Sequence, residues 1–212
     1  MRQTLRSITT LAIVAMVVGV TTLAARAGEP TDQLKSRLDL VLKTVQDPDV
    51  KKGGRAAERR AVRKIAEEIF DFEDTAQRVL GRHWAQRSPS ERQEFVTLFT
   101  DVFEHAYISK IDLYQGERVT YLGDTIDGTQ AMVRTQFLTK QGSRVHVDYR
   151  MKQAGGRWKI YDVIIEGASL IDNYRSQFNS VILRASYDEL VRRLKVIQSN
   201  LLTEEGRGPG RS

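Results

Sequence analysis

Between residues 31 and 113 the apolar side chains recur at the spacing of amphipathic helices. Three helices are predicted in the first part of this segment, because Asp47-Pro48 and Gly53-Gly54 interrupt the pattern and Gly81 suits a helix end. The third helix is expected over residues 72–80. The apolar stripes of the first two helices are Leu34, Leu38, Val41 and Val45, and then Val62, Ile65 and Ile69.

A fourth helix is predicted from Ser88 to about residue 112. Ser88 is placed to cap it, Pro89 suits its first position, and Glu91 is placed to reach back to the cap. Its apolar side chains cover a wider arc than the roughly 100° stripe of an ordinary surface helix. Such a helix contacts neighbours on two sides, either as a central core helix or as one wall of a cavity for an apolar ligand. The residues of this arc are Phe95, Val96, Leu98, Phe99, Val102, Phe103, Ala106 and Tyr107.

From Arg118 the apolar residues alternate with polar ones, which predicts strands with one buried and one solvated face. Connections containing glycine at 140–143 and 153–156 predict an antiparallel meander of about four strands. The residues expected on the buried face are Ala131, Val133, Thr135 and Phe137, followed by Val145, Val147, Tyr149 and Met151.

Helical spacing returns after Gly167, with one helix predicted from Ser169 to about Leu183 and another from Ser186, where Glu189 completes a capping box. Gly167 is expected either to hold a backbone conformation that other residues avoid or simply to precede the helix. The fold class is therefore α+β, with helices packed on one face of a curved antiparallel sheet. We expect an apolar pocket between the helices and the sheet.

The N-terminus combines Arg2 and Arg6, an apolar run and an A-x-A site ending at Ala27. This order is typical of a secretory signal peptide over residues 1–27, with an uncleaved membrane anchor as the alternative. We expect cleavage near Ala27 and export to a bacterial periplasm. Residues 28–200 should then form a single domain and residues 201–212 a disordered tail.

Removing Arg2, Arg6 and Arg26 with the signal lowers the formal net charge from +6 to +3. So small a surplus does not indicate nucleic-acid binding. The basic segment at 51–64 is typical of a solvated helix face, and the alternative is a docking surface for an acidic partner or anionic headgroups. The sequence contains no cysteine, so disulfides, thiolate metal sites and catalytic thiols are excluded.

Residues suited to catalysis form no recognised motif. His83, His105 and His146 are scattered and match no metal-ligand spacing. Tyr161 and Asp162 are a candidate pair for proton abstraction, but adjacent strand residues point to opposite faces unless a bulge intervenes. We therefore expect a protein that is not an enzyme and has no cofactor or metal. A small-molecule isomerase or hydrolase and a module that binds an acidic partner are the alternatives.

Several segments stand in a distinctive order and spacing: FDFEDTAQRVLGRHW at 70–84, SPSERQEFVTLF at 88–99, YRM at 149–151, WKIYDV at 158–163, EGASL at 166–170 and NYRSQF at 173–178. Together they resemble the MlaC family, the periplasmic phospholipid-binding proteins also called toluene-tolerance or auxiliary transport proteins. With the exported N-terminus and the terminal helix, the likeness spans nearly all of the chain after residue 27.

The resemblance implies a lipid carrier that holds a phospholipid with its acyl chains in an apolar pocket and its headgroup near solvent. It implies exchange with an inner-membrane ABC transporter that has an MCE-domain subunit, and with an outer-membrane lipoprotein-porin complex. Branches of the family are linked to hopanoids or other lipids, so another lipid stays open as the ligand. A shuttle of this kind is expected to be a monomer.

The pocket is expected where the broad arc of the fourth helix faces the sheet, although the same residues would also suit a filled core. Arg175 is expected at the rim, where it would meet a phosphate or a partner acid, with a structural ion pair as the alternative. The residues predicted to contact lipid are Phe99, Phe103, Tyr107, Val133, Phe137, Val147, Tyr149, Met151, Trp158, Ile165, Tyr174 and Phe178.

Overall fold

The computed structural model describes residues 30–107 and 118–206, with residues 55, 56, 107 and 202–206 described by their backbone alone. The predicted signal peptide and the end of the predicted fourth helix lie outside these ranges. Within the two ranges, no helix has the length and apolar character needed to span a membrane.

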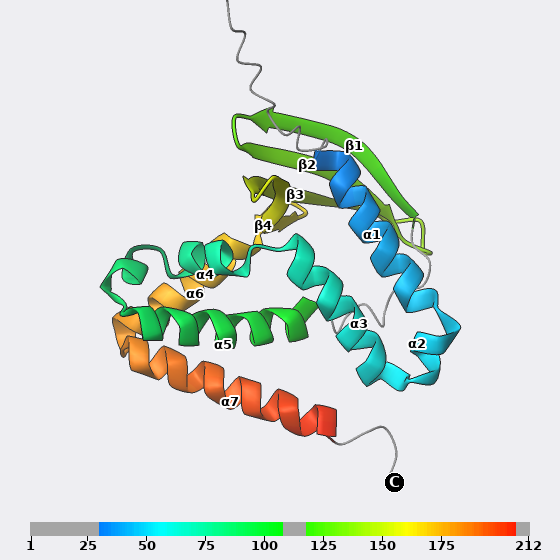
Figure 1. Cartoon of the computed structure of the whole chain (residues 1–212). Coiled ribbons are helices and arrows are strands. Elements are labelled where there is room, and N and C mark those ends of the chain that lie inside the picture. The colour runs from blue at the N-terminus through cyan, green and yellow to red at the C-terminus, as the bar shows by residue number, and fades with distance from the viewer. Residues whose placement is uncertain (1–29, 108–117, 207–212) are drawn as a thin grey trace, which may run out of the picture.

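The N-terminal half is helical, as the spacing predicts, with one additional short helix. Asp47 and Pro48 do not leave a loop, because the Asp47 carboxylate accepts a hydrogen bond from the Asp49 amide at 2.8 Å and starts a further helix. The elements, shown in Figure 1, are α1 (Pro30–Gln46), α2 (Pro48–Lys52), α3 (Gly54–Ile69), α4 (Phe72–Leu80), the 3₁₀ helix η1 (Gly81–Gln86) and α5 (Pro89–Tyr107).

The capping box predicted for α5 is present. The Ser88 amide donates to Glu91 Oε2 at 2.7 Å, and the Glu91 amide donates to Ser88 Oγ at 3.2 Å. These bonds satisfy amides that the helix itself leaves without partners, so the start of α5 is fixed by its own sequence.

The sheet is antiparallel with the strands in sequence order, and it has five strands where about four are predicted. The fifth is a two-residue strand that pairs with the end of β4. The predicted alternation is confirmed, because Val133, Thr135, Tyr149 and Met151 are all buried on one face. The strands are β1 (Arg118–Asp127), β2 (Gln130–Leu138), β3 (Arg144–Ala154), β4 (Arg157–Ile165) and β5 (Ala168–Ser169).

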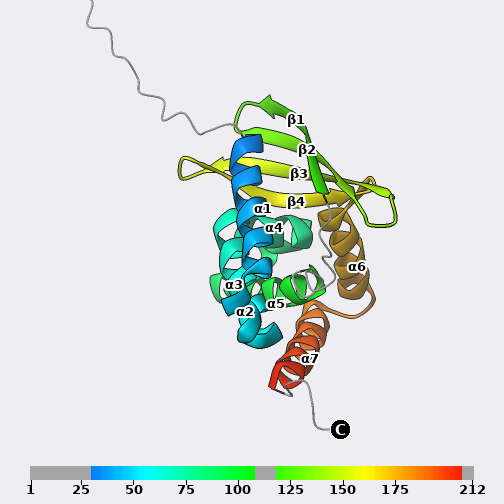
Figure 2. The same ribbon diagram turned by 90° about the vertical axis from the view of Figure 1, so that its right-hand side faces the viewer.

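The helices form two layers beneath the sheet (Figures 1 and 2). Helix α1 packs across β1 and β2, while α3, α4 and α6 (Leu170–Arg184) pack against β4. Helix α5 packs against α4 and against α7 (Tyr187–Gly206) in the layer farther from the sheet. The wide apolar arc of α5 therefore serves mainly helix packing, although Phe99 and Phe103 also line spaces that β4 borders.

Helix α1 is fastened to the sheet at its N-terminal end. The Thr31 amide donates to Asp124 Oδ2 on β1 at 3.1 Å. The Trp158 amide, at the start of β4, donates to Gln33 Oε1 at 3.0 Å. These bonds join residues far apart in sequence and hold α1 over the face of the sheet.

Helix α7 begins with a hydrogen bond from the Glu189 amide to Ser186 Oγ at 3.1 Å, as expected for a cap. It continues to Gly206, beyond the boundary at Asn200 predicted for the tail. Residues 207–212 lie outside the described ranges.

The turn between β4 and α6 uses a backbone conformation that favours glycine. Gly167 has φ of +82°, and the following Ser169 caps α6 by accepting a hydrogen bond from the Asp172 amide at 3.1 Å. The sequence left the role of Gly167 open between an enforced conformation and a plain helix entry, and the positive φ establishes the first.

We predict that Gly167→Ala lowers the free energy of unfolding by about 1 kcal/mol, because a side chain disfavours this φ. No atom lies within 4 Å of the position that its Cβ would take, so the loss is conformational and not steric. Gly167→Asn should recover part of the loss, because asparagine tolerates positive φ. Urea denaturation measures the free energy of unfolding of the parent and of the two variants. An alanine variant as stable as the parent would contradict an enforced backbone conformation at Gly167.

Candidate functional site

An apolar cavity of about 200 Å³ lies between the helices and the sheet. Helices α1 and α3 form one side of it, and β3 and β4 form the other. Its lining residues are Arg37, Leu38, Val41, Val62, Ile65, Ala66, Ile69, Phe70, Phe72, Phe103, Tyr149, Ile160, Val163, Ile165 and Leu170.

The helical walls of the cavity come from the apolar stripes of α1 and α3. Leu38 and Val41 lie on one face of α1, and Val62, Ile65 and Ile69 lie on one face of α3 at the same spacing. Leu34, earlier on the α1 stripe, is fully buried in the core. The α1 stripe thus packs in the core at one end and borders the cavity farther along.

The junction between α3 and α4 closes one end of the cavity. Phe70 forms an isolated parallel bridge with Ile160, and the Asp71 amide donates to the Ile160 carbonyl at 2.8 Å. The Phe70 ring stacks on Phe72 at 5.4 Å between centroids, and the Phe103 ring meets Phe70 edge-on at 5.7 Å. Three aromatic rings from α5 and this junction therefore form a compact group at the end of the cavity.

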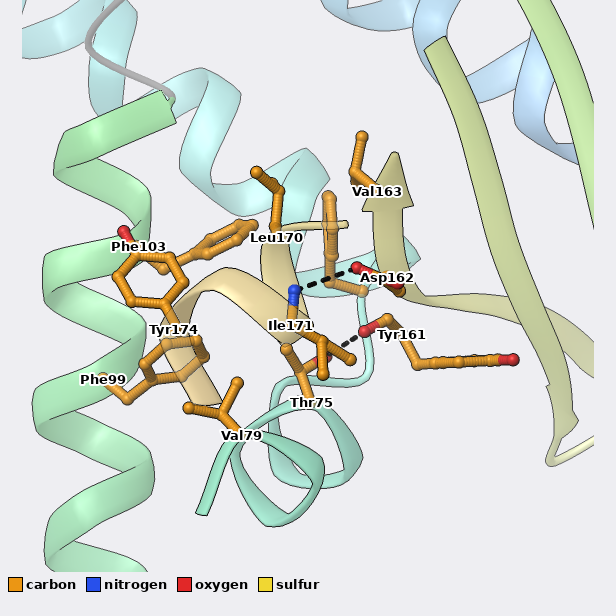
Figure 3. Close-up of a pocket in the computed structure, with 11 residues that line it drawn as sticks. Thr75, Val79, Phe99, Phe103, Tyr161, Asp162, Val163, Leu170, Ile171 and Tyr174 are labelled. Carbon is orange, nitrogen blue, oxygen red and sulfur yellow. Dashed lines mark hydrogen bonds between the residues drawn. The ribbon is translucent and has the colours of Figure 1, made fainter. Parts of the chain in front are cut away.

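A second, much smaller void of about 10 Å³ lies beyond this group (Figure 3). It shares Phe70, Phe103, Val163 and Leu170 with the larger cavity, so these four side chains separate the two spaces. A void of this size holds about one water-sized probe, so the region is essentially filled. Its other lining residues are Thr75, Val79, Phe99, Tyr161, Asp162, Ile171 and Tyr174.

The residues predicted to contact lipid are distributed over several environments. Phe103, Tyr149 and Ile165 line the larger cavity. Phe99 and Tyr174 line the small void. Val133, Met151, Trp158 and Phe178 are buried in the core, Phe137 and Val147 are half-buried on the sheet, and the side chain of Tyr107 lies outside the described residues.

The sequence reasoning missed the walls contributed by α1 and α3. Their stripes were identified, but the cavity was expected next to α5 and not between α1 and the sheet. Tyr149 is the one predicted sheet residue on β3 that lines the cavity, and burial raises the pKa of its hydroxyl well above its usual range. That phenol therefore stays neutral at physiological pH.

Arg175 lies outside the lining of both spaces. Its Nε donates to the Arg78 carbonyl at 2.8 Å, and Nη1 lies 2.9 Å from Asp172 Oδ1. The first contact joins α6 to the last turn of α4, and the second is an ion pair within α6. A structural ion pair was the alternative that the sequence left open for this residue.

The side chain of Asp162 is held by hydrogen bonds from three neighbouring elements. Its buried carboxylate accepts hydrogen bonds from Arg150 Nη1 at 3.1 Å, from Ser169 Oγ at 2.7 Å and from the Ile171 amide at 3.1 Å. The last of these is drawn in Figure 3. The carboxylate thus joins β3 to β4 and both to the start of α6.

Tyr161 is the extra residue of a bulge in β4. Arg150 pairs with Asp162 and Met151 with Ile160, so Tyr161 has no direct partner on β3. The bulge allows adjacent residues 161 and 162 both to be buried. The Tyr161 ring nevertheless points away from the small void in Figure 3, and its hydroxyl donates to Gln130 Oε1 at 3.2 Å. The pair is therefore not arranged as an acid and a phenol facing one pocket.

The described histidines lie in separate environments. His83 is buried and hydrogen-bonded to Asn179 Oδ1 at 3.0 Å, while His146 is exposed beside Gln136. Within residues 30–107 and 118–206, no three or more His, Cys, Asp and Glu side chains group so that they could hold a metal ion.

We predict that Asp162→Ala lowers the free energy of unfolding by about 3 kcal/mol, because it removes a buried charge partner and leaves the Ile171 amide without an acceptor. Asp148→Ala on the solvated face of β3 is the matched control, and a change below about 0.5 kcal/mol is expected for it. Urea denaturation compares the two. Equal stability of both variants would show that the Asp162 contacts contribute little.

The protein is thus of the α+β class, with an antiparallel sheet and an apolar cavity beneath it. The family model described as MlaC protein matches residues 35–196, so the chain belongs to the MlaC family. The family resemblance found in the sequence is thereby confirmed.

Individual relatives agree with this assignment. The chain is 20% identical over 142 residues to the intermembrane phospholipid transport system binding protein MlaC of Haemophilus influenzae, a match that covers 65% of this chain and 66% of the relative. It is 22% identical over 130 residues to the toluene tolerance protein ttg2D of Pseudomonas putida, covering 60% of each. The chain thus matches less than two thirds of the length of each of these curated relatives.

A solved structure matches more completely. It is that of a phospholipid-binding protein from Ralstonia solanacearum in complex with a phospholipid, with a TM-score of 0.74 and 28% sequence identity. The match covers 82% of this chain and 99% of the other. The fold described above is therefore shared with a protein that was solved with a phospholipid bound.

Proposed function

We propose that this chain is a periplasmic lipid carrier that binds the acyl chains of a glycerophospholipid in the cavity between α1, α3 and the sheet. The observation that carries the proposal is an apolar cavity in a fold that matches a phospholipid-bound relative over 99% of that relative's length. Relatives named for phospholipid binding and transport support a carrier and not an enzyme.

The apolar lining matches the physical task of a lipid carrier. Exposing an acyl chain to water costs about 0.8 kcal/mol for each methylene group, so a carrier must cover the chain with apolar surface. Leu38, Val41 and Ile65 offer such surface from the helices, and Val163 and Ile165 offer it from the sheet. The absence of charge along most of this lining also disfavours a water-filled site.

The cavity is smaller than a whole lipid requires. Its volume of about 200 Å³ lies below the range of about 300 to 1,000 Å³ that is typical of ligand sites. In this proposal further room is made when side chains around the cavity move, among them Phe103 and Leu170, which also border the small void. In this proposal Phe103, Tyr149 and Ile165 contact the acyl chains directly, and Phe99 and Tyr174 contact the deepest part of a chain.

The proposed partners are two membrane complexes. Lipid would be exchanged with an inner-membrane ABC transporter that has an MCE-domain subunit and with an outer-membrane lipoprotein-porin complex, as the family resemblance implies. The name of the Haemophilus influenzae relative, which describes an intermembrane phospholipid transport system, supports a shuttle between membranes. Export through the signal predicted at residues 1–27 would place the carrier in the periplasm.

The lipid content of the purified protein tests the proposal. The full chain is exported in a Gram-negative host, purified from the periplasm without detergent and extracted with organic solvent for mass spectrometry. Stoichiometric glycerophospholipid is expected. Stoichiometric hopanoid would support a lipid carrier but change the proposed ligand from glycerophospholipid to hopanoid. A stable protein without lipid would contradict the proposal.

Filling the cavity should exclude lipid. Ala66 is buried and lines the cavity, so we expect Ala66→Phe to reduce the bound lipid severalfold by occupying part of its space. Ala61→Phe is the matched control, because Ala61 lies on the same helix outside the lining residues. Circular dichroism verifies that both variants fold. Equal lipid content in the two variants would place the lipid elsewhere.

A further inference from the structure

We infer that Arg37 binds the phosphate of the carried lipid and exchanges Glu68 for it when lipid enters. This inference rests on the proposed function and assigns its headgroup contact. Among the described residues that line the cavity, Arg37 is the one that carries a charge. A single cation in an otherwise apolar lining suits a ligand with a long apolar part and one anionic group.

Arg37 lies where the cavity meets solvent. It precedes Leu38 and stands about one helical turn before Val41 on α1, and both of these residues line the cavity. Arg37 lines the cavity and its side chain is 32% exposed, so this side chain is in contact with both the apolar lining and water. A lipid with its chains against Leu38 and Val41 would hold its phosphate at this level.

The present partner of Arg37 is Glu68 on α3. Arg37 Nη1 lies 2.6 Å from Glu68 Oε2, and the Glu68 side chain is 44% exposed. Glu68 adjoins Ile69, which lines the cavity, so the ion pair connects the two helical walls. Ion pairs this exposed contribute little to stability, so exchanging the carboxylate for a phosphate costs little.

The chemistry of arginine favours this assignment. A guanidinium group presents paired N–H donors that match two oxygens of a phosphate, and the contact is stronger than a neutral hydrogen bond. Glu68 already occupies the position of an oxyanion on this group. The carboxylate therefore marks where phosphate oxygens would lie.

Two other arginines, one on α3 and one on α6, are engaged elsewhere. Arg63 contacts Asp101 at 3.0 Å and Glu104 at 2.8 Å on α5, as well as Glu67 at 3.2 Å on its own helix. Arg175 is held by the Arg78 carbonyl and Asp172. Neither residue lines the cavity. Arg37 is therefore the better candidate for the headgroup contact than Arg175, which the sequence suggested.

Two lipids with identical chains test the inference. Dioctanoylphosphatidylglycerol carries the phosphate, and dioctanoylglycerol lacks it. The equilibrium affinity of the full exported chain for each lipid is measured by calorimetry after removal of bound lipid. The proteins compared are the parent, Arg37→Gln, Glu68→Gln, Arg175→Gln and the control Arg60→Gln, which removes the same charge from an exposed position on α3.

Arg37→Gln is expected to weaken binding of the phosphate-bearing lipid about tenfold, as for loss of a charge-assisted hydrogen bond, and to leave dioctanoylglycerol binding unchanged. Glu68→Gln should strengthen binding of the phosphate-bearing lipid alone, because it removes the competing carboxylate. Arg60→Gln should change neither affinity. Inorganic phosphate alone should not bind measurably, because the apolar chains supply most of the binding free energy.

Several results would overturn the inference. One is that Arg37→Gln leaves the affinities for both lipids unchanged. Another is that it weakens binding of both lipids equally, which would make Arg37 a wall residue without a phosphate contact. A selective loss in Arg175→Gln instead would move the headgroup site, and binding of inorganic phosphate through Arg37 would make it a site for a free anion. A parent protein that binds neither lipid would overturn the proposed function and this inference with it.

Discussion

The buried carboxylate of Asp162 is the interaction on which the rest of the architecture depends. A buried charge is tolerated only when donors surround it, and here the donors come from β3, from the end of the sheet and from the first turn of α6. The short connection through Gly167 brings that helix back to the strand it has just left. Helix α6 then holds Phe178 against Phe95 and Tyr174 against Phe99 on α5, which fixes the outer helical layer. A single side chain thereby relates the sheet to both layers of helices.

Much of the fold was readable from local sequence, because the signals there are short-range. Ser88 with Glu91 marks the start of α5, and alternation around Val133 and Tyr149 marks the buried sheet face. The bulge at Tyr161 was not predictable, since nothing in the adjacent residues distinguishes an extra residue from a regular strand. The short helix α2 was missed because Asp47-Pro48 signals both a break and a new helix start.

The candidate site was less predictable than the fold. An apolar stripe looks the same in the sequence whether it packs against a neighbour or borders an empty space. Leu34 and Leu38 belong to one stripe of α1, yet the first is fully buried in the core and the second lines the cavity. Phe95 and Phe103 differ in the same way on α5, because Phe103 extends to the cavity while Phe95 packs against α6. Only the arrangement of α1 and α3 over the sheet decides which residues pack in the core and which line the cavity.

The cavity also bears on how long the protein persists in a cell. Unfilled apolar volume lowers the free energy of unfolding by about 24 cal/mol per Å³. For a cavity of about 200 Å³ the upper limit of this loss is on the order of 5 kcal/mol. Any ligand that fills it restores part of this loss by binding the folded state alone. Proteases that degrade transiently unfolded chains would remove empty molecules faster than occupied ones. The surviving population would then be enriched in loaded protein by turnover alone, without any regulator of loading.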